Sequence, residues 1–285
     1  MRRNFARDEQ IAGQIRKWKN DAKTAPTAYQ RRDSEKAVRA YNRAYSYPLC
    51  DRNAAGLGLM QLGDAVYQYL CLLLVLALCC ALFSQEHESG MYQVLYAAKR
   101  GKAALFRQKI CAGMLFAAVL GMLFQTLLFV FLWARRGLPF SLLGAPMQTF
   151  PEFALCPFAL NLAEYMLLRG FSFALGGVLA VAVIAVISAF FRRTLVIFGA
   201  SAAICAALLL PGLTAQTSAA GDIMYRAGLL GIMQIEQYLR GYETVNVCGY
   251  PVWQIALTLI FTVLFIAVLT LIGRIFYAEV RHAEI

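Results

Sequence analysis

The His, Cys, Lys and Ser residues of this chain are not spaced as catalytic, metal-binding or phosphate-binding motifs require. Its two histidines lie far apart in the sequence, and the neighbours Cys79 and Cys80 do not have the C-x-x-C spacing of a zinc or redox motif. Gly101 and Lys102 lack the earlier glycine and the following Ser or Thr of a phosphate-binding loop. No arrangement of Ser, His and acid indicates hydrolysis. The sequence therefore predicts no catalytic residue, no metal site and no cofactor in this chain.

The elements that would have to position any site are mostly apolar. Hydrophobic residues make up 60% of the 285 positions and charged residues only 15%, against roughly 25% charged in an ordinary soluble domain. Of the 27 Lys and Arg, 13 fall in residues 1–63, together with six acids. This composition predicts an all-α, polytopic membrane protein. We expect a basic helical extramembrane segment over residues 1–63 and a transmembrane domain over residues 64–285.

Five stretches are long and apolar enough to be transmembrane helices, since a helix needs about 20 apolar residues to cross the hydrocarbon core. None of the five holds an acid in its interior, which argues against a transporter that moves ions along its own helices. The predicted spans are residues 65–83, 110–133, 170–191, 194–213 and 252–276.

The positive charge of the loops predicts the orientation. The loops after the first and third spans, with the tail after the fifth, hold nine Lys and Arg, whereas the two longer loops hold five. Because Lys and Arg accumulate in cytoplasmic loops, we expect a multi-pass protein of the plasma membrane with a cytoplasmic carboxyl terminus and with residues 1–63 outside the cell. The alternative is a cytoplasmic amino-terminal segment with one of the five stretches re-entrant.

The extramembrane regions have patterns of their own. Residues 5–23 and 27–45 are rich in helix-forming residues and predict two helices separated at Pro26, with a solvated basic face and no nucleic-acid partner. Four prolines predict broken surface structure over residues 135–168. An apolar stretch at 224–235, too short to span, predicts a segment that dips into the membrane. A disulfide is chemically possible among the three cysteines expected outside the membrane, which are Cys50, Cys156 and Cys248.

The loop after the first span is the most informative one. An apolar stripe at helical spacing predicts a short amphipathic helix over residues 86–98, lying under the membrane. Glu86 and Glu88 are expected at its amino-terminal end, where the helix dipole favours carboxylates. The stripe consists of Met91, Val94, Leu95 and Ala98.

In order and spacing, this loop resembles that of the permease subunits of the ABC-2 family of ATP-binding cassette transporters. Such permeases carry, between their second and third spans, a Phe, an acid, a Gly, a Leu pair, a basic-Gly-basic break and a Lys that opens the next helix. The matching residues here are Phe83, Glu86, Gly90, Val94, Leu95, Arg100, Gly101, Lys102, Leu105 and Lys109. The family has six spans, so the resemblance implies that its first span is lacking here and that residues 1–63 correspond to an extracellular insert between its first two spans.

The resemblance also implies a function and partners. It implies a permease subunit that moves a substrate across the membrane, as an exporter, while ATP and Mg bind a separate cytoplasmic ATPase subunit. A second permease copy or paralogue in the lipid bilayer would complete the substrate path. The ATPase-coupling helix would hold Glu86, Gly90, Met91, Val94, Leu95, Arg100, Gly101 and Lys102.

Other functions remain open at this point. Amphipathic basic loops also serve as plain interfacial anchors. Two alternatives therefore remain, a secondary transporter and a membrane scaffold or sensor that transports nothing. Nothing in the sequence indicates the substrate.

Overall fold

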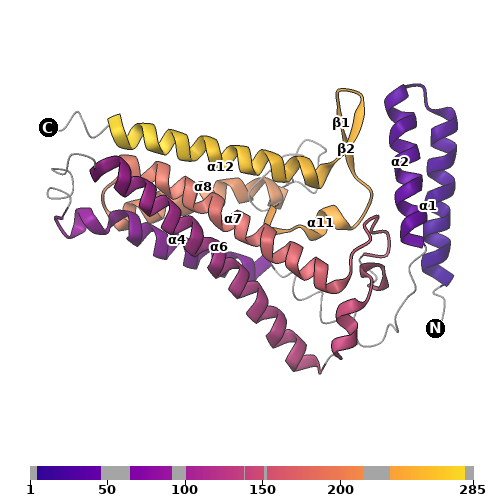
Figure 1. Ribbon diagram of the computed structural model, residues 1–285, viewed down its shortest axis with the longest axis horizontal. Helices are drawn as coiled ribbons and strands as arrows, with labels where there is room; N and C mark the ends of the chain where they lie inside the picture. The colour runs from indigo at the N-terminus through magenta and orange to yellow at the C-terminus, as the bar shows by residue number, and fades with distance from the viewer. Residues whose placement is uncertain are drawn as a thin grey trace. The chain divides into compact units, whose positions relative to one another are not determined.

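The protein is mostly helical. The structure, a computed structural model, describes residues 5–45, 65–91, 101–137, 139–150, 153–214 and 232–279. Within these residues it has eight α-helices and one two-stranded sheet (Figure 1). The elements are α1 (Phe5–Thr24), α2 (Ala28–Tyr45), α4 (Ala65–Glu88), α6 (Gly101–Arg136), the 3-10 helices η2 (Phe140–Gly144) and η3 (Met147–Thr149), α7 (Leu162–Phe190), α8 (Thr194–Thr214), α11 (Glu236–Leu239), β1 (Thr244–Val247), β2 (Tyr250–Trp253) and α12 (Gln254–Glu279).

Four helices of the described chain are long and apolar enough to cross a membrane, and they indicate a multi-pass membrane protein. The first, second, third and fifth predicted spans fall on them. The fourth predicted span falls on α8, which is mostly apolar along its length. The four apolar windows are Tyr69–Glu86 in α4, Ala104–Arg135 in α6, Leu162–Phe190 in α7 and Gln254–Phe276 in α12.

The chain forms two compact units that combine segments distant in sequence. Unit 1 comprises Met1–Gly63, Thr126–Arg169 and Ile235–Leu257. Unit 2 comprises Asp64–Gln125, Gly170–Gln234 and Thr258–Ile285. The sequence predicts the boundary after residue 63, but it does not indicate that the amino-terminal segment groups with two later segments.

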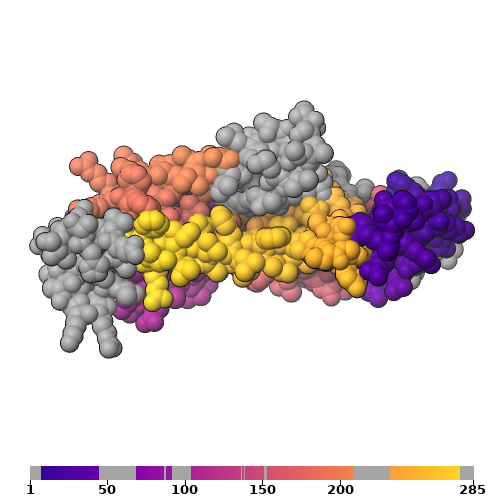
Figure 2. Space-filling view, turned by 90° about the horizontal axis from the view of Figure 1, so that it is seen from above, coloured from indigo at the N-terminus to yellow at the C-terminus, as the bar shows by residue number. Residues whose placement is uncertain are grey.

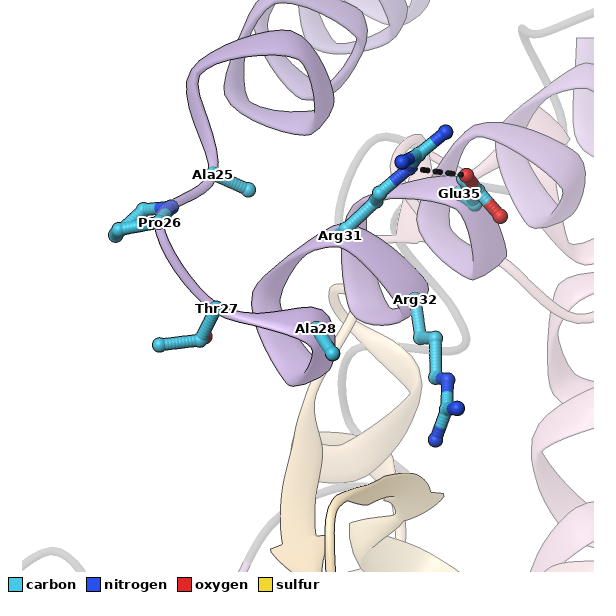
Figure 3. A pocket seen from close by; sticks show the side chains of 7 residues that line it. All are labelled: Ala25, Pro26, Thr27, Ala28, Arg31, Arg32 and Glu35. Atoms are coloured by element: carbon cyan, nitrogen blue, oxygen red, sulfur yellow. Dashed lines mark hydrogen bonds and ion pairs between the residues drawn. The ribbon is translucent and has the colours of Figure 1, made fainter.

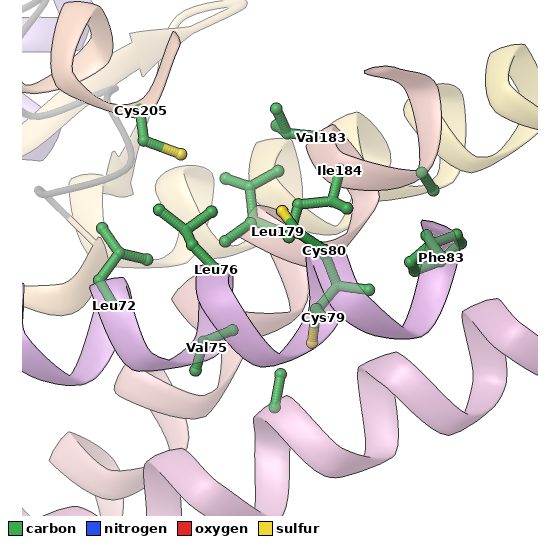
Figure 4. Packing of buried hydrophobic residues seen from close by; sticks show 14 of the residues in the cluster. Leu72, Val75, Leu76, Cys79, Cys80, Phe83, Leu179, Val183, Ile184 and Cys205 are labelled. Atoms are coloured by element: carbon green, nitrogen blue, oxygen red, sulfur yellow. The ribbon is translucent and has the colours of Figure 1, made fainter. Parts of the chain in front are cut away.

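In unit 2, α4 and α7 supply most of the apolar core. The apolar window of α7 is 78% buried, whereas that of α12 is only 6% buried. Although α4 is apolar all round, one side of it packs inward, with Leu76 and Cys80 buried and Leu74 and Leu78 exposed (Figure 4). Helix α12, coloured yellow in Figure 2, lies on the surface with most of its apolar side chains exposed.

Glycines allow α6 and α7 to approach each other closely. A Cβ added at Gly121 of α6 would lie 3.2 Å from Cα of Ala174 in α7, and one at Gly177 of α7 would lie 3.3 Å from the Ala117 carbonyl oxygen of α6. Backbone atoms cannot move aside as a flexible side chain does. Small residues are typical of such helix contacts in membranes, where packing rather than the hydrophobic effect holds helices together.

In unit 1, the segment between α6 and α7 is broken into short 3-10 helices, as its prolines predict, but residues 145–150 are buried rather than at the surface, whereas Phe140 is exposed. Its short 3-10 helices pack around Met147, Phe150 and Cys156, all buried. The buried Gln148 amide donates to the carbonyl oxygens of Cys156, at 3.2 Å, and Phe158, at 2.7 Å. Side-chain hydrogen bonds of this kind satisfy a proline-rich backbone that cannot form a regular helix.

The α1–α2 helix pair, the "helical hairpin" below, and the β1–β2 strand pair complete unit 1. The prediction of two helices separated at Pro26 is confirmed. Strands β1 and β2 pair antiparallel around Cys248 and Gly249, whose φ angles are 50° and 85°. Positive φ at both central residues is typical of the two-residue turn that suits twisted strands. The sequence analysis missed these strands.

We predict that replacing Gly121 with Leu destabilises the protein, because the new side chain would collide with the α7 backbone at Ala174. Overpacking of this kind costs roughly 1–3 kcal/mol. Thermal unfolding of the purified protein in detergent should show a lowered midpoint. The matched control is Gly199→Leu in α8, where an added Cβ meets open space. An equal loss of stability in both variants would contradict the close α6–α7 packing.

Candidate functional site

The last turn of α4 carries a cluster of polar contacts, which we call the α4-end cluster: Glu86 and Glu88 of α4 with Lys109 of α6 and Thr194 of α8. These residues belong to unit 2. Lys109 and Glu86 match the family pattern described above, and Thr194 was not singled out by the sequence. The cluster therefore brings both ends of the informative loop into contact.

Glu86 and Lys109 form an ion pair that joins α4 to α6. The Lys109 ammonium lies 3.1 Å from Oε2 of Glu86 and also donates to the Phe83 carbonyl oxygen, at 3.3 Å. The two side chains are only 16% and 10% exposed. A mostly buried pair of this kind loses hydration when it forms, so each charge depends on the other to remain there.

Glu88 reaches across to the first residue of α8. Its Oε1 accepts the Thr194 backbone N–H, at 3.0 Å, and the Thr194 hydroxyl, at 2.6 Å. The Thr194 hydroxyl is also hydrogen-bonded to the Ser84 hydroxyl. These bonds from the Thr194 side chain and backbone hold the pKa of Glu88 below its usual range. An acid from one helix thus satisfies a donor at the amino terminus of another, where a negative charge is favoured.

The cluster corrects the predicted local structure of Glu86 and Glu88. They do not begin an amphipathic helix, because α4 runs on through Glu88. It stops before Gly90, whose φ of 73° is the left-handed conformation that commonly ends a helix. Both carboxylates therefore lie at the carboxyl end of α4, the end that disfavours negative charge. Lys109 and the α8 terminus offset this disadvantage.

The other predicted coupling residues are divided between the described segments. Met91 is exposed just after α4, and Gly101 and Lys102 are the first residues of α6. Val94, Leu95 and Arg100 lie outside the described residues. The coupling role of these positions stays a prediction.

An open hollow of about 560 Å³ lies beside the cluster. Leu78 and Leu82 line its apolar side, and Gln85, Glu88 and Thr194 line its polar side. The described residues contain no group of three or more His, Cys, Asp or Glu placed to hold a metal ion. The residues present here can accept and donate hydrogen bonds and form ion pairs.

A second polar cluster is buried in unit 1. Arg169 of α7 is 1% exposed and lies 2.6 Å from Oε1 of Glu236 in α11. The Tyr165 hydroxyl donates to the same oxygen, at 3.2 Å, and accepts from Arg169, at 3.3 Å. Arg169 is helical rather than part of a loop, because α7 begins eight residues before the predicted span, at Leu162 rather than residue 170. Nothing in the sequence predicts the contact between Arg169 and Glu236.

The cysteines expected outside the membrane do not form a disulfide within the described residues. Cys156 is a buried free thiol and Cys248 an exposed one. Burial raises the pKa of Cys156 to about 11, which keeps it protonated. Cys50 lies outside the described residues.

Comparison of the chain with protein-family models, with curated protein sequences and with solved structures gave no match. The functional assignment therefore rests on the residues themselves and on their arrangement.

We predict that Lys109→Met lowers stability, because it leaves the Glu86 carboxylate without its cation in a mostly buried position. Breaking such a pair costs roughly 3 kcal/mol, whereas removing both charges is far less costly. The double variant Glu86→Gln/Lys109→Met should therefore recover part of the loss. Unfolding midpoints in detergent would measure both effects.

The matched control is Arg107→Met, which removes an exposed cation from the same helix. Its midpoint should stay close to that of the unchanged protein. If Lys109→Met and Arg107→Met unfold alike, the ion pair does not join α4 to α6.

Proposed function

We propose that this chain is a membrane-spanning permease subunit of an ATP-binding cassette transporter of the ABC-2 type, moving its substrate outward with energy from a separate ATPase subunit. The observation that carries the proposal is the ordered pattern of residues from Phe83 to Lys109. The four long apolar helices of the described chain are consistent with a membrane-spanning subunit. In the proposed arrangement, α8 is a fifth span, and a second permease copy or paralogue completes the path.

The α4-end cluster supports a coupling role for the loop between α4 and α6. The loop leaves α4 directly after two carboxylates, Glu86 and Glu88, which contact α6 and α8 respectively. A displacement of the loop by an ATPase would therefore act on three helices through short polar contacts. A plain interfacial anchor needs no such connection.

One observation favours the alternative of an ion-coupled transporter. The buried Arg169–Glu236 pair places an ionisable acid against α7, and buried charges in membrane proteins often mark ion or proton pathways. The two candidates differ in their energy source. Transport by reconstituted protein that needs ATP and a partner ATPase favours the permease, and transport driven by an ion gradient alone favours the alternative.

The proposal predicts that Val94→Asp and Leu95→Asp disrupt association with the ATPase. Burying an unpaired carboxylate costs several kcal/mol, and each 1.4 kcal/mol is tenfold in affinity, so association should fall roughly a hundredfold or more. ATPase activity that co-purifies with the full chain in mild detergent, and ATP-dependent transport after reconstitution, would measure the effect.

The matched control is Val245→Asp, which introduces the same charge at an exposed site on β1 in unit 1. It should retain the ATPase. Expression and membrane insertion should be the same in all variants. Full retention of the ATPase and of transport in both loop variants would exclude the coupling assignment.

The proposed orientation places the loop at residues 92–100 in the cytoplasm and unit 1 outside. Reporter fusions after Lys102, Arg193 and Ile285 should give cytoplasmic signals, because the loops there carry most of the positive charge. Fusions near Gly144 and Gly241 should give outside signals. A cytoplasmic signal at Gly144 would exclude this orientation.

A further inference from the structure

The helical hairpin presents an unbalanced charge to its surroundings. The structure describes its side chains over residues 8–44, where eight Lys and Arg are exposed and only two acids, Glu9 and Glu35. Two of these cations are already in contact with the chain itself. Arg31 pairs with Glu35 at 3.3 Å (Figure 3), and Arg32 lies over the Tyr250 ring. Five other exposed cations of the hairpin are Arg16, Lys17, Lys19, Lys23 and Arg39.

Contacts within unit 1 turn one acid of the hairpin toward β1. The Asp33 carboxylate accepts the Tyr242 hydroxyl, at 2.9 Å, and the Thr244 hydroxyl, at 2.5 Å. Burial and the neighbouring Asp33 raise the pKa of Tyr242, so its hydroxyl remains protonated as a donor. Asp33 is turned toward β1, Glu35 is paired with Arg31, and Asp8 and Asp21 are half-buried, so the exposed charge of the hairpin is mainly positive.

The apolar side chains of the hairpin are also already in use. Ile11, Ala37, Tyr41 and Ala44 are buried, and no large apolar side chain between residues 8 and 44 is among the exposed ones. Protein partners usually need an apolar or aromatic anchor at the centre of the contact. A partner of this surface is therefore recognised by charge.

The contacts of the hairpin in unit 1 place it near the start of α12, and therefore near the headgroup layer of the membrane. The Lys36 ammonium donates to the Pro251 carbonyl oxygen, at 2.7 Å, and lies 4.7 Å from the centre of the Trp253 ring. The next residue, Gln254, begins the apolar window of α12. Trp and Tyr are enriched where a transmembrane helix enters the headgroup layer. Contacts with residues 249–253 thus hold the hairpin at the level of that layer.

We propose that the exposed cations of the helical hairpin bind the anionic phospholipid headgroups of the membrane that α12 enters. These cations are Arg16, Lys17, Lys19, Lys23 and Arg39. Charges near the surface of an anionic leaflet act over about 8–10 Å at ordinary salt. Because α12 tethers the hairpin to the bilayer, binding does not require a second encounter in solution. The inference depends on a membrane-spanning α12 and not on the permease function.

The test uses the full chain in nanodiscs of phosphatidylcholine alone and of phosphatidylcholine with phosphatidylglycerol. An amine-acylating reagent followed by peptide mass spectrometry would give the reactivity of Lys17, Lys19 and Lys23. In the anionic discs at low salt each should react about fivefold more slowly, the factor that corresponds to about 1 kcal/mol per cation at such a surface. The difference should vanish near 1 M salt, where the Debye length is about 3 Å.

Lys36 provides an internal control, since Pro251 holds its ammonium in either disc and its reactivity should change least. The variant Arg16→Gln/Arg39→Gln leaves all the labelled lysines in place and should weaken their protection. Glu9→Gln, which removes an exposed acid, should not weaken it. An unchanged Lys36 reactivity in the variants would show that the hairpin is still docked.

Three outcomes would overturn the proposal. One is equal reactivity of Lys17, Lys19 and Lys23 in the two kinds of disc at low salt. Another is equal protection by soluble glycerol phosphate in phosphatidylcholine discs, which would indicate a site for free phosphate. The third is protection that Arg16→Gln/Arg39→Gln leaves unchanged.

Discussion

The hydrocarbon core of a membrane offers no partner to a polar group, and this constraint accounts for where the polar contacts of the chain lie. They gather at the ends of the apolar helices. Glu86 and Glu88 meet their partners in the last turn of α4, and Thr194 meets its partner at the start of α8. Arg169 and Glu236 pair within the first turns of α7 and at the short helix α11. Between these ends the helices pack mainly through apolar side chains and glycines, with a few buried polar residues such as Gln125 and Ser201.

The same constraint explains which parts of the fold the sequence predicts. A run of about 20 apolar residues has few structures open to it, so the positions of α4, α6, α7 and α12 follow from composition. Their ends do not. The charged residues Glu164 and Arg169 suggest a loop by composition, yet α7 already begins at Leu162, where the Glu164 carboxylate caps the helix by accepting the Asn161 backbone N–H, at 2.9 Å. Arg169 pairs with Glu236, which is distant in sequence. A pairing of that kind cannot be read from one sequence.

Which side of each helix is buried was likewise beyond the sequence. Leu74 and Leu76 of α4 are chemically identical, yet one is exposed and the other is buried against the core. Such helices carry no polar face that would orient them. The β1–β2 pair was missed for a different reason: its strands have four residues each, and its turn uses Cys248-Gly249 in place of the usual Asn-Gly. The alternation of Thr244, Val245, Asn246 and Val247 was the one available signal.

The two carboxylates at the end of α4 differ in how firmly they hold their neighbours. Glu86 is mostly buried with Lys109, so separating them would leave two poorly hydrated charges, and α4 and α6 therefore tend to move together. Glu88 is solvent-exposed, and water can replace Thr194 as its partner at little cost. The backbones of α4 and α8 nevertheless lie close together, so packing holds these two helices side by side whether or not Glu88 contacts Thr194.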